Sequence, residues 1–178
     1  MSSGPTVPAR TTVSALAEVL DVDLEEVQAV LAAGAEPGSP DEVLDAETIL
    51  SVAEALGASV HIEPRDVALE RLYGAETSGI DPTEVSGRAR GIVEGVLQRR
   101  DAMDEQIENA SEHWSVARMP AVDRSILRIG LYELLEEPDI PTAVIVSEAV
   151  RLAKTYSTER SGSFVNGVLA TLAREVRD

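Results

Sequence analysis

Apolar residues recur at helical spacing along most of the 178-residue chain. Steps of three and four residues bring successive side chains onto one face of an α-helix. In the last third of the chain, Pro120 and Pro141 each stand at a position typical of the first turn of a helix. The pattern predicts an all-α fold, whose C-terminal region holds three helices with buried aliphatic faces.

Residues 10–63 have the pattern of a small, mostly helical module. Three short apolar stripes are separated by polar breaks, and the last stripe ends at Gly57 before a strand-like segment, 58–62. Asp23 and Asp45 each stand where a side chain can cap the first turn of a helix. The preceding residues 1–9, rich in Ser, Gly and Pro, are predicted to form a flexible leader.

Residues 64–178 form the second predicted domain, which Pro64 opens at the start of a helix. From Val85 to Trp114, apolar residues recur at steps of three and four, with one step of seven across Arg99-Arg100. This spacing favours a single helix of about eight turns. The helix is expected to open at Asp81-Pro82-Thr83, and Trp114 is expected to belong to the core.

Composition restricts the classes of function. The chain has no cysteine, which excludes disulfides, thiolate zinc sites and cysteine nucleophiles. His61 and His113 lack the spacing of a metal-binding pair, and no glycine-rich phosphate loop occurs. We therefore expect neither an enzyme nor a cofactor. Because no signal peptide and no apolar run of about 20 residues is present, a cytoplasmic location is expected.

Negative charge dominates the chain and is unevenly distributed. The formal net charge is -17, of which residues 1–63 contribute -11 and residues 64–178 contribute -6. Non-specific binding of nucleic acid depends on neutralising phosphates with Lys and Arg. The charge therefore argues against a general affinity for nucleic acid, above all in the first segment.

Three segments in the C-terminal region resemble, in order, the last helices of the NusB family of bacterial transcription antitermination factors. They read VDRSILRIGLYELL, IPTAVIVSEAVRLAKTYS and SGSFVNGVL. The upstream segment VALERLYGAETSGI is similar to the first helix of that family, so the resemblance covers residues 64–178. It implies a NusB-like helical bundle, preceded here by the small N-terminal domain.

The resemblance also implies partners and site residues. Members of the family bind boxA-type RNA together with the ribosomal protein NusE, within the RNA polymerase antitermination complex of ribosomal RNA operons. The positions expected to contact RNA are Arg65, Arg71, Tyr73, Arg124, Lys154, Arg160 and Ser163. Glu133 and Phe164 are expected to lie nearer the protein partner.

One departure from the family leaves an alternative open. Where the family has an Arg-rich first helix, this chain reads HIEPRDVALERLYG, which retains only Arg65 and Arg71. The alternative is a divergent protein-interaction module that has kept the fold and lost RNA binding.

Asp123 and Arg124 are predicted to bridge neighbouring helices, and a structural role is favoured for Asn166-Gly167 over direct RNA contact.

The N-terminal segment has a resemblance of its own. Its break into a second helix and the run LDAETILSVAEALG are similar to the N-terminal module of bacterial translation initiation factor two. A generic helix-turn-helix-like domain fits the same pattern, and both readings stay open. Asp23, Glu25 and Glu26, with no cation beside them, disfavour DNA as a ligand in either case.

Overall fold

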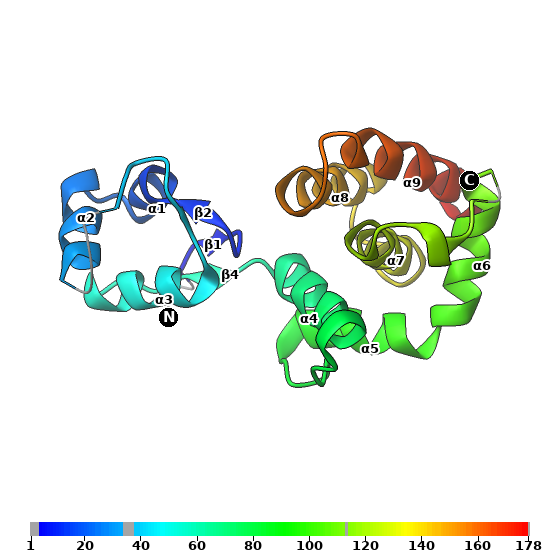
Figure 1. Ribbon diagram of the computed structural model, residues 1–178, viewed down its shortest axis with the longest axis horizontal. Helices are drawn as coiled ribbons and strands as arrows, with labels where there is room; N and C mark the ends of the chain where they lie inside the picture. Colours follow the sequence, from blue (N-terminus) through cyan, green and yellow to red (C-terminus); the bar gives the residue numbers. More distant parts are fainter. Residues whose placement is uncertain (1–3, 34–37, 113, 178) are drawn as a thin grey trace. The chain divides into compact units, whose positions relative to one another are not determined.

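The structure is a computed structural model that describes residues 4–33, 38–112 and 114–177 (Figure 1). The chain divides into two compact units, residues 1–66 and 67–178. Helices predominate in the described residues, and the few strands are two residues long, so the predicted all-α class is confirmed.

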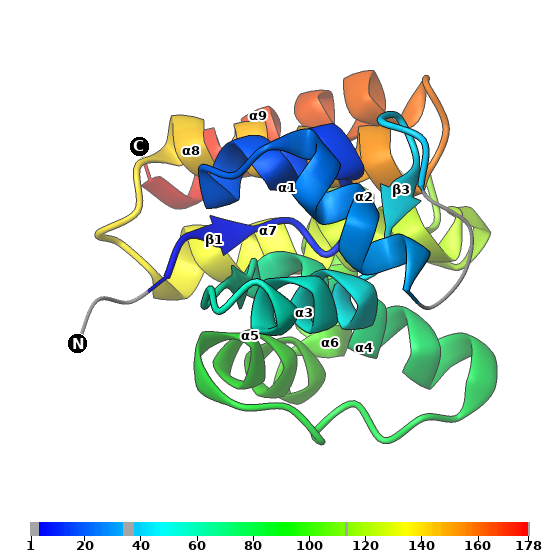
Figure 2. The ribbon, with the colours of Figure 1, turned by 90° about the vertical axis from the view of Figure 1, so that its left-hand side faces the viewer.

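The first unit combines short helices with two small strand pairs. Its helices are α1 (Val13–Leu20), α2 (Leu24–Ala32) and α3 (Ala46–Ala55). β1 (Thr6–Val7) pairs in parallel with β4 (His61–Ile62), and β2 (Thr11–Thr12) pairs antiparallel with β3 (Val43–Leu44). Figure 2 shows α1 and α2 beside each other, with α3 crossing below them. Buried aliphatic side chains from these helices form the core of this unit.

The predicted leader is partly built into this unit. Val7 and Ala9 are fully buried, and the Ala9 N–H donates to Asp66 Oδ1 at 3.3 Å. The prediction of a flexible leader is therefore wrong for residues 6–9, because β1 buries its apolar side chains when it pairs with β4. Residues 1–3 lie outside the described residues.

The predicted capping residues behave differently from each other. Asp45 caps α3, since its Oδ1 accepts a hydrogen bond of 2.8 Å from the Thr48 N–H. This backbone bond and a side-chain bond from Thr48 lower the pKa of Asp45. Asp23 stands at the N-cap position of α2 but makes no side-chain capping bond.

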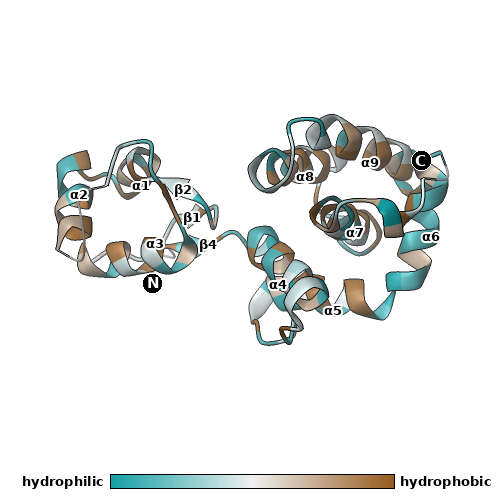
Figure 3. Ribbon diagram, viewed as in Figure 1, coloured by the Kyte–Doolittle hydropathy of each residue, from teal (hydrophilic) through white to brown (hydrophobic). Residues whose placement is uncertain are grey.

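The second unit is helical in its described residues. The helices are α4 (Pro64–Ser78, which begins in the first unit), α5 (Gly87–Gln98), α6 (Arg100–Ala110), the 3₁₀ turn η1 (Val116–Arg118), α7 (Ala121–Glu136), α8 (Thr142–Tyr156) and α9 (Ser161–Arg177). α7, α8 and α9 pack against one another, and Figure 3 shows apolar residues along each of them. Their aliphatic faces form one core with α4, α5 and α6.

The predicted long helix is instead two helices. Arg99 leaves the helical conformation, with φ of -117° and ψ of 15°, and separates α5 from α6. The break falls within the seven-residue step of the apolar pattern. Asp81-Pro82-Thr83 does not open a helix, because Asp81 Oδ1 accepts from both the N–H and the hydroxyl of Thr83 and holds a local turn.

Trp114 was expected in the core, but 45% of its surface is exposed. It lies between the end of α6 and η1, outside the helices whose aliphatic faces form the core. His61 is exposed in β4, and His113 lies outside the described residues.

Within residues 4–33, 38–112 and 114–177, no helix is both long and apolar enough to cross a membrane. In the same ranges, no group of three His, Asp or Glu side chains could hold a metal ion.

Candidate nucleic-acid interface

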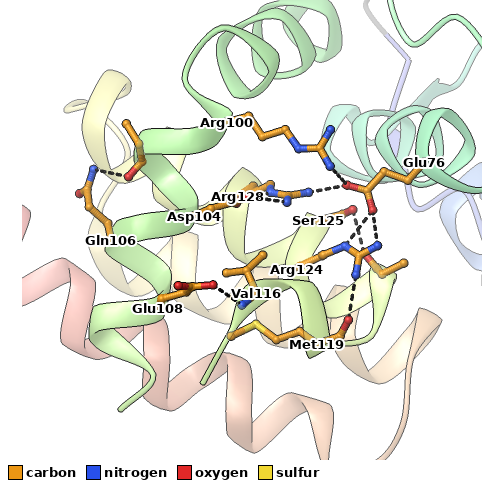
Figure 4. Close-up of polar contacts among 12 residues, drawn as sticks. Glu76, Arg100, Asp104, Gln106, Glu108, Val116, Met119, Arg124, Ser125 and Arg128 are labelled. Atoms are coloured by element: carbon orange, nitrogen blue, oxygen red, sulfur yellow. Dashed lines mark hydrogen bonds and ion pairs between the residues drawn. The ribbon is translucent and has the colours of Figure 1, made fainter. Parts of the chain in front are cut away.

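Glu76, near the end of α4, accepts hydrogen bonds from three guanidinium groups (Figure 4). Its Oε1 accepts from Arg100 Nη2 at 2.8 Å and from Arg128 Nη1 at 2.6 Å. Its Oε2 accepts from Arg124 Nε at 2.8 Å. Arg128 also donates to both carboxylate oxygens of Asp104, at 2.7 and 2.8 Å. The network ties α4 to α6 and α7.

Burial and charge act in opposite directions on Glu76. Burial by itself would raise the pKa of Glu76, but hydrogen bonds from Arg124 and Arg128 outweigh that effect and lower it. Glu76 is absent from the residues expected from the sequence. The sequence feature that could have indicated Glu76 is its position one helical turn after Leu72, which is buried on the inner side of α4.

Two residues expected to contact RNA are engaged inside the protein. Arg124 uses all three of its nitrogens, donating Nε and Nη2 to Glu76 and Nη1 to the Met119 carbonyl oxygen. Arg65 is only 7% exposed, and its Nη1 lies 3.0 Å from Glu63 Oε1. The structure therefore confirms Arg124 as a bridge between helices, and it contradicts the expectation that Arg65 is open to a phosphate.

The residues expected near a protein partner are also partly or fully enclosed. Glu133 is 1% exposed and pairs with Arg88, which in turn lies 2.7 Å from Glu137. Glu133 is therefore enclosed within the helical bundle rather than displayed on its surface. Phe164 is half-buried, and its ring meets the exposed Trp114 edge to face, with centroids 5.0 Å apart and planes at 63°.

Three of the expected RNA contacts come together where α9 begins. Lys154, Arg160 and Ser163 are exposed. The aliphatic stem of Lys154 packs over Gly162, where a Cβ would lie 3.3 Å from Lys154 Cγ. We call Lys154, Arg160 and Ser163 the α9-start cluster. Two cations beside the amino end of a 17-residue helix form a site that favours anions, because the positive end of the helix dipole adds to their charge.

The close helix contact expected at Gly167 is not found. Asn166 and Gly167 are both exposed, and a Cβ added at Gly167 would meet no atom within 4 Å. Close helix contact is therefore not the reason for this glycine. Asn166 lies one turn after Gly162 and lines the same groove as Lys154, which places its amide beside the α9-start cluster.

A chain of hydroxyl groups holds the turn before this cluster. Ser161 Oγ donates to Asp123 Oδ2 at 2.9 Å and accepts from Ser157 and Thr158, at 3.0 and 2.9 Å. Asp123 is 3% exposed, and its Oδ1 has no partner among the described residues. The predicted role of Asp123 as a bridge between helices is confirmed, since its carboxylate joins α7 to α9.

The remaining expected RNA contacts lie on α4. Tyr73 is 41% exposed and lines a cavity of about 180 Å³ together with Tyr156, the last residue of α8. Arg71 is half-buried. The pKa of Asp81 is lowered first by hydrogen bonds from Thr83 and also by the charge of Arg71.

A family model described as the NusB family matches residues 49–174. The chain belongs to the NusB family. Residues 1–48 lie outside the match, and the matched region begins within α3.

Named relatives agree with this assignment. The chain is 45% identical over 125 residues to the transcription antitermination protein NusB of Clavibacter sepedonicus, covering 70% of this chain and 88% of the relative. It is 49% identical over 108 residues to the NusB protein of Frankia casuarinae, covering 61% of this chain and 79% of the relative. The family is one of transcription antitermination factors.

Solved NusB structures share the fold. NusB of T. maritima is 34% identical with a TM-score of 0.59, over 65% of this chain and 91% of that chain. A crystal structure of the antitermination factors NusB and NusE in complex with double-stranded RNA is 27% identical with a TM-score of 0.56, over 63% and 94% of the two chains. The helical bundle of this chain is therefore NusB-like.

Proposed function

We propose that this chain is an RNA-binding factor in transcription antitermination of ribosomal RNA operons. It binds boxA-type RNA together with NusE, as part of the RNA polymerase antitermination complex. Membership of the NusB family supports the proposal, as does the solved neighbour in which NusB and NusE are bound to double-stranded RNA. The observation that carries it is the α9-start cluster, an exposed cationic site on a chain of net charge -17.

RNA contacts are proposed for residues that the structure leaves accessible. Lys154 and Arg160 supply charge to phosphates, and the Ser163 hydroxyl donates a hydrogen bond. Tyr73 presents an exposed ring on which an unpaired base can stack. Arg71 adds charge on the same helix as Tyr73.

A protein contact is proposed for the aromatic pair formed by Trp114 and Phe164. Trp114 is 45% exposed, and large aromatic rings commonly supply the strongest contacts of protein interfaces. NusE is the proposed partner at this pair. Trp114→Ala is expected to weaken NusE binding by about tenfold or more, which corresponds to about 1.4 kcal/mol.

A titration of boxA RNA tests the RNA-binding role. RNA affinity is measured with and without NusE at several salt concentrations, using the whole chain. Lys154→Ala is expected to weaken binding and to reduce the dependence of log affinity on log salt by about 0.7. Arg90→Ala is the matched control, because Arg90 is exposed on α5 and its ion pair among the described residues is with the neighbouring Glu94. Absence of binding at low salt, with and without NusE, would remove the RNA role.

The second candidate is an interaction module that retains the fold without RNA binding. The burial of Arg65 favours it, because this residue occupies the family's basic arm and is closed to phosphates. In that case NusE binds the wild-type chain, and Trp114→Ala weakens the complex. Adding boxA RNA changes the NusE affinity of neither protein.

The first unit is proposed to contact the translation apparatus, on the strength of its similarity to the initiation-factor module. Leu50 is 46% exposed on α3, with Glu47 and Glu54 on the same side of the helix. Leu50→Glu is expected to reduce cosedimentation of the whole chain with ribosomal subunits. Unchanged cosedimentation would exclude a contact through this face.

A further inference from the structure

A groove runs between the exposed sides of α8 and α9. It consists of one hollow of about 710 Å³ and another of about 480 Å³, which share Ala143 and Val146. Its floor is built from small aliphatic side chains, namely Ala143, Val146, Val150, Ala170 and Ala173. We call this the α8–α9 groove. Apart from Lys154 at one end, it is separate from the residues proposed to contact RNA.

Cations stand at both ends of this aliphatic floor. Lys154 lines the first hollow, and Arg174 lines the second. Among the described residues neither forms an ion pair, and the hydrogen bonds of Arg174 go to Ala170 and Thr171 of its own helix. Ala143 and Lys154 stand eleven residues apart on α8, which corresponds to about 16 Å.

The lining favours a protein segment over RNA as the occupant. Single-stranded RNA is bound largely by stacking its bases on aromatic rings or guanidinium planes. The described residues that line the α8–α9 groove include no aromatic side chain. An aliphatic floor gains free energy by removing apolar surface of a partner from water, at roughly 25 cal/mol per Å². The cations at its ends select negative charge in that partner.

We propose that the α8–α9 groove docks an acidic, aliphatic segment of a protein partner. Carboxylates of the segment pair with Lys154 and Arg174, and Leu, Ile or Val side chains lie on the floor between them. The length of the groove fits about five extended residues or about three turns of helix. The contact shares Lys154 with the proposed RNA site, whereas its aliphatic floor and Arg174 lie outside that site.

Selection from a random peptide library, with the intact chain as bait, tests the proposal. Selected peptides are expected to place Asp or Glu on either side of Leu, Ile or Val. The affinity of the tightest peptide is then measured by fluorescence anisotropy. Ala170→Glu is expected to weaken it by at least about tenfold, because a carboxylate on the floor repels the acidic peptide. Arg174→Ala is expected to weaken it by about fivefold.

Matched variants separate docking from folding. Ala170 and Ala143 are exposed, so Ala170→Glu and Ala143→Glu leave the core intact, which thermal unfolding verifies. Ala102→Glu places the same charge on an exposed position of α6 outside the groove and is expected to leave peptide affinity unchanged.

Four results would overturn the proposal. The first is a selection that yields no peptide, or basic ones. The second is peptide binding that survives both Ala143→Glu and Ala170→Glu. The third is a loss of boxA affinity in Ala170→Glu, which would assign the groove to RNA. The fourth is self-association that Ala170→Glu abolishes, which would assign it to a second copy of the chain. Failure of RNA binding alone leaves the docking proposal intact, since Arg174 is not among the proposed RNA contacts.

Discussion

Ser161 Oγ donates a hydrogen bond of 2.9 Å to Oδ2 of Asp123, and it joins the first residue of α9 to the first turn of α7. Both residues are buried. The same hydroxyl accepts from Ser157 and Thr158, so one serine organises the turn between α8 and α9. The exposed side chains of Arg160 and Ser163 flank this anchor.

Ser161→Ala is expected to destabilise the protein by about 1–3 kcal/mol, because a buried carboxylate then loses its hydrogen-bond donor. Urea denaturation measures the change in unfolding free energy. Ser163→Ala is the control, and its cost should stay within about 0.5 kcal/mol because the side chain is exposed. Equal costs for the two substitutions would contradict the anchoring role of Ser161.

Arg128→Ala is expected to cost about 3 kcal/mol of stability. The guanidinium is 5% exposed and bonds Asp104 and Glu76, so its removal takes both hydrogen bonds of Arg128 from the half-buried Asp104 and one donor from Glu76. Arg128→Lys should not restore the loss, because an ammonium cannot make the paired bonds to Asp104. Arg90→Ala, which breaks an exposed pair with Glu94, should cost about 0.3–0.5 kcal/mol. Chemical denaturation compares the three variants.

The lowered pKa of Glu76 predicts a pH dependence. Because the pKa is lower in the folded state than its ordinary value of 4.5, the stabilisation by ionised Glu76 is complete above that value. It is lost as the pH falls through the folded pKa. The difference in unfolding free energy between wild type and Glu76→Gln should therefore be constant near neutral pH and shrink below about 4.5. If the difference in unfolding free energy between wild type and Glu76→Gln grew as the pH fell, the prediction would be contradicted.

Two glycines of α5 should respond oppositely to alanine. A Cβ at Gly95 would overlap the ring of Tyr132 on α7, so Gly95→Ala is expected to cost about 1–3 kcal/mol. A Cβ at Gly91 would meet only Tyr132 Oη, at 3.8 Å. Gly91→Ala should therefore stabilise the protein by about 0.5–1 kcal/mol, through the better helix propensity of alanine. Thermal unfolding of both variants measures the sign of each effect.

The local periodicity of apolar residues was sufficient to predict much of the fold. The apolar stripes of α7, α8 and α9 are visible in the sequence because helix geometry repeats over a few residues. Asp45 was also predictable as a cap, since its bond to Thr48 spans three residues. The interruption at Arg99 was missed, because a seven-residue step is compatible with a continuous helix as well as with a break.

By itself, the sequence determined the helical class, the NusB resemblance and the presence of cations near the start of α9, because these depend on short-range spacing. Only the tertiary structure decided which charges are available. Arg124 and Glu133 carry the residue types of a binding surface, yet each is enclosed by a partner more than 40 residues away in the sequence. Pairings between distant segments depend on how helices pack, so the functional surface emerges only when the chain is folded.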